Sequence, residues 1–309
     1  MLLPADLPTP LQVLDDPDFA RAGVELRLKR DDLAHPTVPG NKWRKLAPNL
    51  AHAVDSGARG LLTYGGAYST HLRAVAAAAR ALGLASIGVV RGEELAGAPR
   101  NWSLRAAEAD GMELRFVSRA DYRQLLTERQ APSAEWLVLP EGGSNAAAVR
   151  GAAAIPAELP GLGPEDLVVC PVGTGGTLAG IAAGLAAGSL AGAAGGDGGD
   201  GGAGARALGV AVLKGEGYLE GEVRELHRAA YGREFANWSI DHTHHGGGYG
   251  RVPTELASFA VEFEQRHGIR PELRYVAKTL AAVHHRAVTG RLTPGTRVTV
   301  VVTGLPDPG

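Results

Sequence analysis

The sequence predicts an α/β protein that is built around parallel strands and divided into two lobes. Short apolar runs alternate with Ala- and Leu-rich helical patterns along nearly the whole chain, which is typical of strand–helix–strand units. A length of 309 residues exceeds what one core usually holds, and it favours two lobes with a cleft between them. Glycine-rich turns follow three of the apolar runs, and in parallel sheets such turns lie at the edge where ligands bind.

The predicted strands are short apolar runs, and each predicted helix is a longer stretch in which Ala and Leu recur at helical spacing. In chain order, the strands are expected at 60–64, 85–91, 113–117, 136–139, 167–171, 207–213 and 297–303. The helices are expected at 41–55, 69–82, 98–109, 177–187, 217–230, 253–267 and 277–289. Residues 188–205 are nearly all glycine and alanine and hold too few large apolar side chains to offset the entropy of ordering. We expect a flexible surface insertion there.

Charge and cysteine content exclude several classes of partner. The formal net charge of −2 leaves no electrostatic footprint for nucleic acid or for an anionic membrane, so a small molecule is the favoured partner. The single cysteine, Cys170, cannot form an internal disulfide and lies in an apolar run where a buried thiol is expected. Because the chain shows no charged-then-apolar leader and no long apolar run, the expected location is the cytoplasm.

Lysine is rare in this chain, and two lysines stand close together. Of the 31 basic residues 26 are arginine, yet Lys42 and Lys45 both fall within the stretch 39–45. A guanidinium stays protonated near neutral pH, whereas a partly buried ε-amine can lose its proton and attack an aldehyde. The stretch therefore favours a Schiff-base lysine over the alternative, which is a pair of solvated lysines on a first helical turn.

A glycine-rich turn at 172–177 connects a predicted strand to a predicted helix. Its backbone N–H groups can converge on an anion, and the hydroxyls of Thr174 and Thr177 add further donors. The glycine spacing fits neither the P-loop nor the Rossmann fingerprint. We interpret the turn as a phosphate site, with a plain tight turn as the alternative.

A second turn of this kind, 64–71, opens its helix with Ser69 and Thr70. Either residue can cap the helix, and Ser69 can at the same time face the crevice beyond the strand. A third turn, 140–145, repeats the pattern and is expected to shape the same crevice.

In this order, the motifs resemble those of the fold-type II pyridoxal-phosphate enzymes, and within them the 1-aminocyclopropane-1-carboxylate deaminase/D-cysteine desulfhydrase family. The likeness runs from about residue 8 to Thr303 and rests on the strings at 28–33, 40–42, 65–69, 140–145, 173–177, 247–250 and 275–278. It implies two open, twisted, mostly parallel sheets with flanking helices, like the tryptophan synthase β subunit. It also implies pyridoxal 5′-phosphate as cofactor, a small amino acid as substrate and a homodimer.

The resemblance also implies a division of the chain and of its site. A large cofactor-binding domain would comprise 1–45 and 150–309, and a small substrate-side domain would comprise 46–149. Lys42 would form the Schiff base, with Asn41 beside it in the same motif. The amides of the glycine-rich turn would bind the cofactor phosphate, namely those of Gly173, Thr174, Gly175, Gly176 and Thr177.

Four further residues take roles from the same resemblance. Ser69 matches a serine on the substrate side, Tyr249 matches an active-site tyrosine, and Tyr275 matches an aromatic residue beside the cofactor ring. Together with Lys42 they form the expected catalytic set. Thr303 would offer its hydroxyl to the pyridine nitrogen and so leave that nitrogen largely unprotonated.

Two positions depart from the family pattern and bear on the reaction. Thr70 stands where the family usually has an asparagine that bonds near the cofactor 3-oxygen, and we keep it among the cofactor-binding residues. Val276 stands where the cyclopropane deaminases have an acid and the desulfhydrase relatives have Thr. The resemblance therefore favours D-cysteine desulfhydrase-like β-elimination that gives a 2-keto acid and ammonia. The alternatives are a 1-aminocyclopropane-1-carboxylate deaminase and a cofactor-binding homologue with weakened catalysis.

Two charged clusters receive structural rather than catalytic interpretations. The run 241–245 holds three histidines, which zinc or nickel accept as ligands, but relatives have a similar run without a metal requirement, and we expect no metal site. Asp31 and Asp32, next to Arg30, are expected to form a structural charge cluster rather than an acid–base pair.

Overall fold

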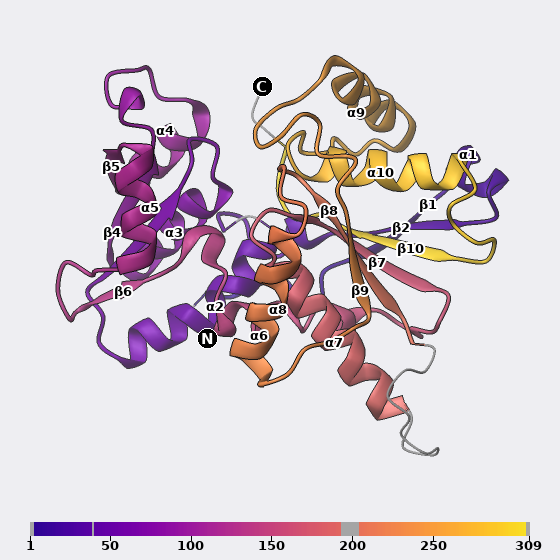
Figure 1. The fold of residues 1–309 in the computed structure, drawn as a ribbon, viewed down its shortest axis with the longest axis horizontal. Helices are drawn as coiled ribbons and strands as arrows, with labels where there is room; N and C mark the ends of the chain where they lie inside the picture. Colours follow the sequence, from indigo (N-terminus) through magenta and orange to yellow (C-terminus); the bar gives the residue numbers. More distant parts are fainter. Residues whose placement is uncertain (1–2, 39, 193–203, 307–309) are drawn as a thin grey trace.

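The computed structural model describes residues 3–38, 40–192 and 204–306, which form two sheets that Figure 1 shows side by side. The larger sheet has the order β1-β2-β10-β7-β8-β9, and the smaller one has the order β5-β4-β3-β6. All neighbouring strands are parallel except β1 and β2. The strands of the larger sheet are β1 (Leu11–Leu14), β2 (Glu25–Lys29), β7 (Asp166–Val172), β8 (Arg206–Ala211), β9 (Trp238–Asp241) and β10 (Arg297–Val301). Those of the smaller sheet are β3 (Gly60–Gly65), β4 (Ala85–Arg91), β5 (Glu113–Val117) and β6 (Trp136–Val138).

Helices cover both faces of the larger sheet, as Figure 1 shows on its right-hand side. One face packs against α6 (Ala146–Ala152), α7 (Gly176–Gly192) and α8 (Tyr218–Tyr231). The other face packs against α1 (Pro17–Arg21), α9 (Thr254–His267) and α10 (Val276–Val288). Because neither face meets water, the central strand β7 is a nearly continuous apolar run, and this is the pattern that allowed it to be predicted.

The smaller sheet is also covered on both faces. Leu61 packs toward α3 (Thr70–Leu82) and α4 (Trp102–Ala109), whereas its neighbour Leu62 packs toward α5 (Arg119–Glu128), because successive side chains alternate across a strand. In Figure 1, α2 (Asn41–Asp55) runs between the two sheets, and it packs on both α6 and α3. The division of the chain at residues 45 and 149 stays a prediction.

The predicted fold class is confirmed, and the differences from the sequence prediction lie in individual elements. The prediction missed β1, β2, β9, α1, α5 and α6, which are short or carry charges that interrupt an apolar run. In β2, the two apolar residues Leu26 and Leu28 alternate with charged residues, so no continuous apolar run marks the strand. Helix α4 begins at Trp102 rather than at residue 98, because Asn101 caps it by accepting a hydrogen bond from Leu104 N at 2.9 Å.

The glycine-rich segment also differs from expectation where it can be compared. We predicted a flexible insertion from residue 188, but α7 continues to Gly192, so its first residues are helical. Residues 193–203 of the expected insertion lie outside the described part of the chain.

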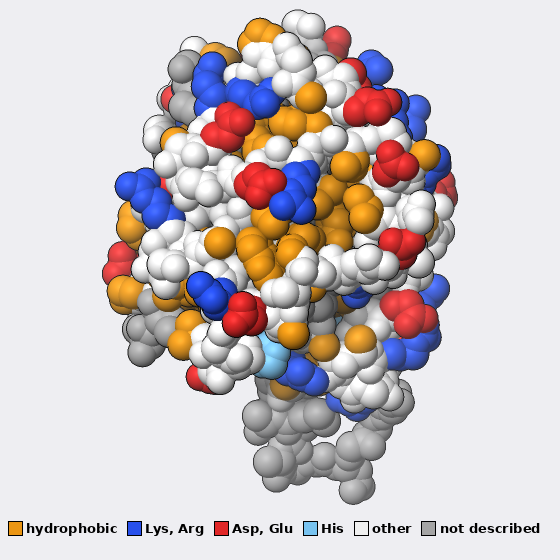
Figure 2. Space-filling view, turned by 90° about the vertical axis from the view of Figure 1, so that its left-hand side faces the viewer, with side chains coloured by type: hydrophobic (Ala, Val, Ile, Leu, Met, Phe, Trp, Pro, Cys, Tyr) orange, Lys and Arg blue, Asp and Glu red, His pale blue; other side chains and the backbone are white. Residues whose placement is uncertain are grey.

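Within the described residues, no helix is long and apolar enough to cross a bilayer. Figure 2 looks onto the side of the smaller sheet, where scattered charges of both signs surround a central hydrophobic area.

Candidate active site

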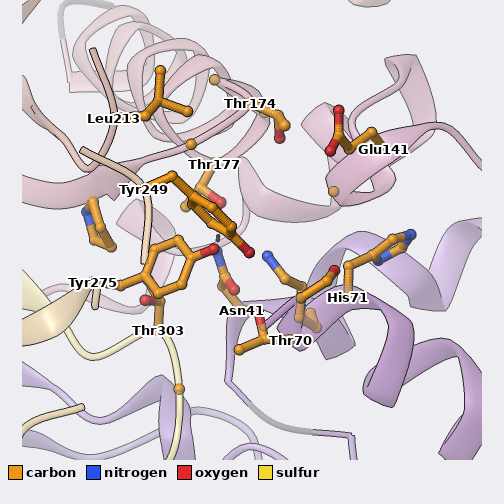
Figure 3. A pocket seen from close by; sticks show the side chains of 18 of the residues that line it. Asn41, Thr70, His71, Glu141, Thr174, Thr177, Leu213, Tyr249, Tyr275 and Thr303 are labelled. Atoms are coloured by element: carbon orange, nitrogen blue, oxygen red, sulfur yellow. Dashed lines mark hydrogen bonds between the residues drawn. The ribbon is translucent and has the colours of Figure 1, made fainter. Parts of the chain in front are cut away.

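A cavity of about 370 Å³ lies at the carboxyl ends of the parallel strands of both sheets (Figure 3). Its walls include the turns that follow β3, β6, β7 and β10, so the two sheets contribute to one site. Every residue predicted for the site lines this cavity, namely Asn41, Lys42, Ser69, Thr70, Gly173, Thr174, Gly175, Gly176, Thr177, Tyr249, Tyr275 and Thr303. The structure therefore brings together residues that are up to 262 positions apart in the chain, from Asn41 to Thr303.

The glycine-rich turn forms a cradle at the start of a helix. Gly175 has a φ of +78°, a conformation that favours glycine, and α7 begins at the next residue. A methyl group on Gly176 would lie 2.6 Å from Ser144 Oγ and 3.1 Å from Lys45 Nζ. The free N–H groups of the first helical turn and these neighbouring donors suit an anion such as a phosphate.

Lys42 is held at the start of α2 by a tight backbone contact. Gly40 precedes the helix with a φ of +59°, and a methyl group there would overlap the carbonyl oxygen of Thr303. Only glycine therefore lets the start of α2 approach the segment that carries Thr303. Burial lowers the pKa of Lys42 from 10.5 to about 8, so about a tenth of its side chain is the nucleophilic free amine at pH 7 and about half at pH 8.

Lys45 also lines the cavity, although the sequence interpretation gave it no role. Its Nζ donates to the Gly142 carbonyl and, at 2.8 Å, to Ser144 Oγ, which lies 2.6 Å from Thr174 Oγ1. Burial and then the nearby Lys42 charge hold the pKa of Lys45 well below its usual range. The available signal was its position three residues after Lys42, which places both lysines on one face of the helix.

A buried ion network anchors the same helix. Arg44 is 1% exposed and donates to Asp31 at 2.7 and 2.8 Å and to Glu158 at 2.8 and 2.9 Å. Asp32 pairs separately with Arg30 at 2.7 Å. Both aspartates thus take arginine partners, and neither lines the cavity.

On the substrate side, Ser69 both caps a helix and faces the cavity. Its Oγ accepts a hydrogen bond from Leu72 N at 3.3 Å, and the side chain lies in the cavity wall. Both interpretations of Ser69 therefore hold at once. Thr70 also lies in the wall, one residue further along the chain.

His71 contributes a buried acceptor that the sequence interpretation missed. Thr63 Oγ1 donates to the Leu139 carbonyl at 3.1 Å, so it can only accept from His71 Nε2, which lies 2.9 Å away. The proton is thereby placed on Nε2, and Nδ1 is left as an acceptor without a partner among the described residues. Burial, together with the charges of Lys42 and Lys45, holds the pKa of His71 well below its usual range, so the ring is neutral.

Two tyrosines face the middle of the cavity, and Figure 3 shows their hydroxyls pointing the same way. The rings of Tyr249 and Tyr275 meet edge to face at 6.4 Å. Burial raises the pKa of both, and both remain hydrogen-bond donors at neutral pH. Lys278 holds the loop before Tyr249, since its Nζ donates to the carbonyls of Gly248 at 3.0 Å and Val212 at 3.2 Å.

The histidine run has acidic partners rather than a shared centre. His242 Nε2 lies 2.7 Å from Glu220, and His244 Nδ1 lies 3.2 Å from Asp241. Across the described residues, no three His, Cys, Asp or Glu side chains are grouped as metal ligands. Cys170 is fully buried, and burial raises the pKa of its thiol to about 12, which leaves it unreactive at neutral pH.

An amine poised near neutral pH beside an anion cradle suits a cofactor that carries both an aldehyde and a phosphate. One buried acceptor in the cavity, Asn41 Oδ1, has no partner among the described residues, while its Nδ2 donates to Thr177 Oγ1 at 2.6 Å. The residues present thus fit pyridoxal phosphate. The fold and the site together define a pyridoxal-phosphate enzyme of fold type II.

The family model for pyridoxal-phosphate-dependent enzymes matches residues 2–304, and the chain belongs to this family. A bifunctional D-cysteine desulfhydrase/1-aminocyclopropane-1-carboxylate deaminase of Arabidopsis thaliana is 33% identical over 199 residues, or 58% of this chain and 49% of that protein. The matches to the first curated relatives span 54%, 58% and 49% of those proteins.

Solved structures agree with this assignment. The crystal structure of a 1-aminocyclopropane-1-carboxylate deaminase homologue superposes with a TM-score of 0.78 at 26% identity, covering 96% of this chain and 89% of that one. A threonine deaminase of Solanum lycopersicum shares the fold, with a TM-score of 0.64 at 15% identity over 97% of this chain and 84% of that one.

Proposed function

We propose that this protein is a pyridoxal-phosphate-dependent lyase that catalyses β-elimination from a small amino acid. The leading substrate is D-cysteine, which with one water would give a 2-keto acid, ammonia and hydrogen sulfide. The observation that carries the proposal is the convergence of Lys42, the 173–177 cradle and Ser69 on one cavity. When bound there, pyridoxal phosphate supplies an electron-accepting ring that stabilises negative charge at the substrate α-carbon.

In this proposal Lys42 has two roles. It would hold the cofactor covalently at rest, and its amine, once free, would take the proton from the substrate α-carbon. A pKa of about 8 suits a group that both gains and loses a proton near neutral pH. Ser69 and the backbone amides of the 66–70 turn bind the substrate carboxylate. Tyr249, which stays protonated because burial raises its pKa, donates a proton or a hydrogen bond to the departing group.

The environment of Val276 supports β-elimination over cyclopropane ring opening. This residue stands where the resemblance expects an acid in the cyclopropane deaminases, but here it is 1% exposed and packs in the core beneath α10. The acid nearest to it in the chain, Glu272, accepts hydrogen bonds from the N–H groups of Arg274 and Tyr275 at 2.8 and 2.7 Å. Glu272 lines the cavity, and both of its carboxylate oxygens accept hydrogen bonds from the backbone at the start of α10.

The test is a direct assay of the purified protein with pyridoxal phosphate. We expect keto acid from D-cysteine, less from 1-aminocyclopropane-1-carboxylate, and none from either with Lys42→Ala. If the cyclopropane substrate gives more keto acid than D-cysteine does, the β-elimination proposal is wrong and the protein acts as a 1-aminocyclopropane-1-carboxylate deaminase. Visible absorbance of the bound cofactor without product from any small D- or L-amino acid would favour the weakened homologue. This alternative is motivated by Thr70, which stands where the family usually has an asparagine. The homodimer stays a prediction that sedimentation can test.

A further inference from the structure

A second pocket, of about 240 Å³, lies at the other end of the strands of the larger sheet from the active-site cavity. It is lined at the amino ends of β8 and β9, whereas the active site lies at the carboxyl ends of the strands. Arg206 opens β8 in this pocket, and Leu213, just past the end of β8, lines the active site. Six strand residues at about 3.3 Å each separate the two sites by roughly 20 Å. A ligand in one pocket therefore does not touch the other.

The pocket is lined by cations without matching acids. Arg206, Arg286 and Arg291 contribute to its wall, and none of its described lining residues is Asp or Glu. Arg286 is already held, with Nη2 3.0 Å from the Asp241 carboxylate. Arg206 and Arg291 are exposed and pair with no carboxylate in the described ranges. Two guanidinium groups are therefore available for an oxyanion, which they bind through paired N–H donors.

A helix end does not account for all of this positive charge. The last carbonyls of α10 lie near the pocket, and Arg291 N–H donates to the Arg286 carbonyl at 2.8 Å. A helix carboxyl end carries roughly half a negative charge. Counted over the described residues alone, Asp241 and this helix end leave more than one positive charge of the three arginines unbalanced.

The rest of the wall is apolar. Leu208 and Leu292 are 3% and 7% exposed, and the half-buried Leu167 packs with them on the face of the sheet that α10 covers. The indole N–H of Trp238 is occupied, since it donates to the Phe235 carbonyl at 2.7 Å. The Trp238 ring packs on the opposite face of the sheet, so the leucines supply the apolar surface of the pocket.

We propose that this pocket binds a small organic anion that carries two or more carboxylate or phosphate groups, at a site separate from the catalytic one. The side chains of Arg206 and Arg291 bind the anionic groups, and the surface formed by Leu167, Leu208 and Leu292 contacts the carbon skeleton. This site is independent of the reaction proposed above, because none of its lining residues belongs to the active-site cavity.

The experiment uses protein saturated with pyridoxal phosphate, so that the 173–177 cradle is filled and cannot capture the probe. Citrate is titrated by calorimetry at constant ionic strength, with chloride as the reference. We expect one citrate per chain, and a Kd that rises about tenfold in Arg206→Gln and again in Arg291→Gln, since each removes a charge-assisted hydrogen bond. The matched control is Arg105→Gln, an exposed arginine of α4 outside this pocket, which leaves the Kd unchanged.

Each remaining outcome overturns the proposal in a defined way. Heat that does not differ between citrate and chloride removes the site. An equal loss of affinity in the Arg105→Gln control places binding elsewhere or reduces it to general charge attraction. Saturable binding of inorganic phosphate without binding of citrate would show that the site takes a bare oxyanion. The proposal of an organic anion as ligand would then be wrong. Unchanged cofactor absorbance in each variant establishes that the protein stays folded.

Discussion

Arg44→Met tests whether the buried ion network holds the start of α2 in place. The substitution removes four charge-assisted hydrogen bonds, of 2.7 to 2.9 Å, to Asp31 and Glu158. Glu158 keeps Lys29 as a partner at 2.6 Å, but the fully buried Asp31 keeps only the Thr9 hydroxyl, at 2.8 Å, among the residues that the structure describes. One buried carboxylate is left without a cation. We therefore expect the free energy of unfolding to fall by about 3–5 kcal/mol.

The assay is urea unfolding at pH 7, followed by tryptophan fluorescence. The matched control is Arg80→Met, which breaks an exposed pair with Asp110 and should cost about 0–1 kcal/mol. Combining Arg44→Met with Asp31→Leu removes the stranded carboxylate and should recover much of the loss. A loss below about 1 kcal/mol for Arg44→Met alone would refute the reasoning.

The same network predicts how stability depends on pH. Its hydrogen bonds and cations lower the pKa of Glu158 from 4.5 to about 2. A carboxyl group whose pKa is lower in the folded state stabilises it fully above the unfolded pKa. This contribution is therefore complete above about pH 4.5 and is lost as the pH falls toward 2. A Glu158→Gln variant should lack this part of the acid unfolding curve.

Three further predictions concern the active site. Covalent capture of pyridoxal phosphate by Lys42 should rise about fivefold between pH 7 and 8 and level off above pH 9, because the free amine reacts and its pKa is about 8; a rate independent of pH would contradict the assignment. Gly176→Ala should weaken cofactor binding by at least about tenfold, measured by absorbance titration, because its methyl group would lie 2.6 Å from Ser144 Oγ. His71→Gln should raise the substrate KM by up to about tenfold, because glutamine keeps a donor toward Thr63 but loses the acceptor at Nδ1. His71→Asn should raise KM less, because the shorter side chain keeps an acceptor at the Nδ1 position. Equal effects of the two variants on KM would show that Nδ1 binds nothing.

Local sequence signals predicted much of the site because they depend on a few adjacent residues. The 172–177 turn needs only glycines between an apolar strand and a helix start, and Lys42 stood out because lysine is rare. Of the groups that were missed, Lys45 had a local signal in its spacing of three residues from Lys42, whereas His71 had none. Lys45 and His71 acquire their roles from Ser144 and Thr63, which come from other parts of the chain.

The sequence by itself determined the alternation of strands and helices, the family resemblance and the residues at the ends of the strands. These features follow from the apolar period and from short motifs that do not depend on distant contacts. Only the tertiary structure decided which protonation states and contacts those residues have. The pKa of Lys42, the tautomer of His71 and the unbalanced arginines of the second pocket depend on burial and on partners far away in the chain. Desolvation and hydrogen bonding act through distance in space, and a linear pattern does not encode that distance.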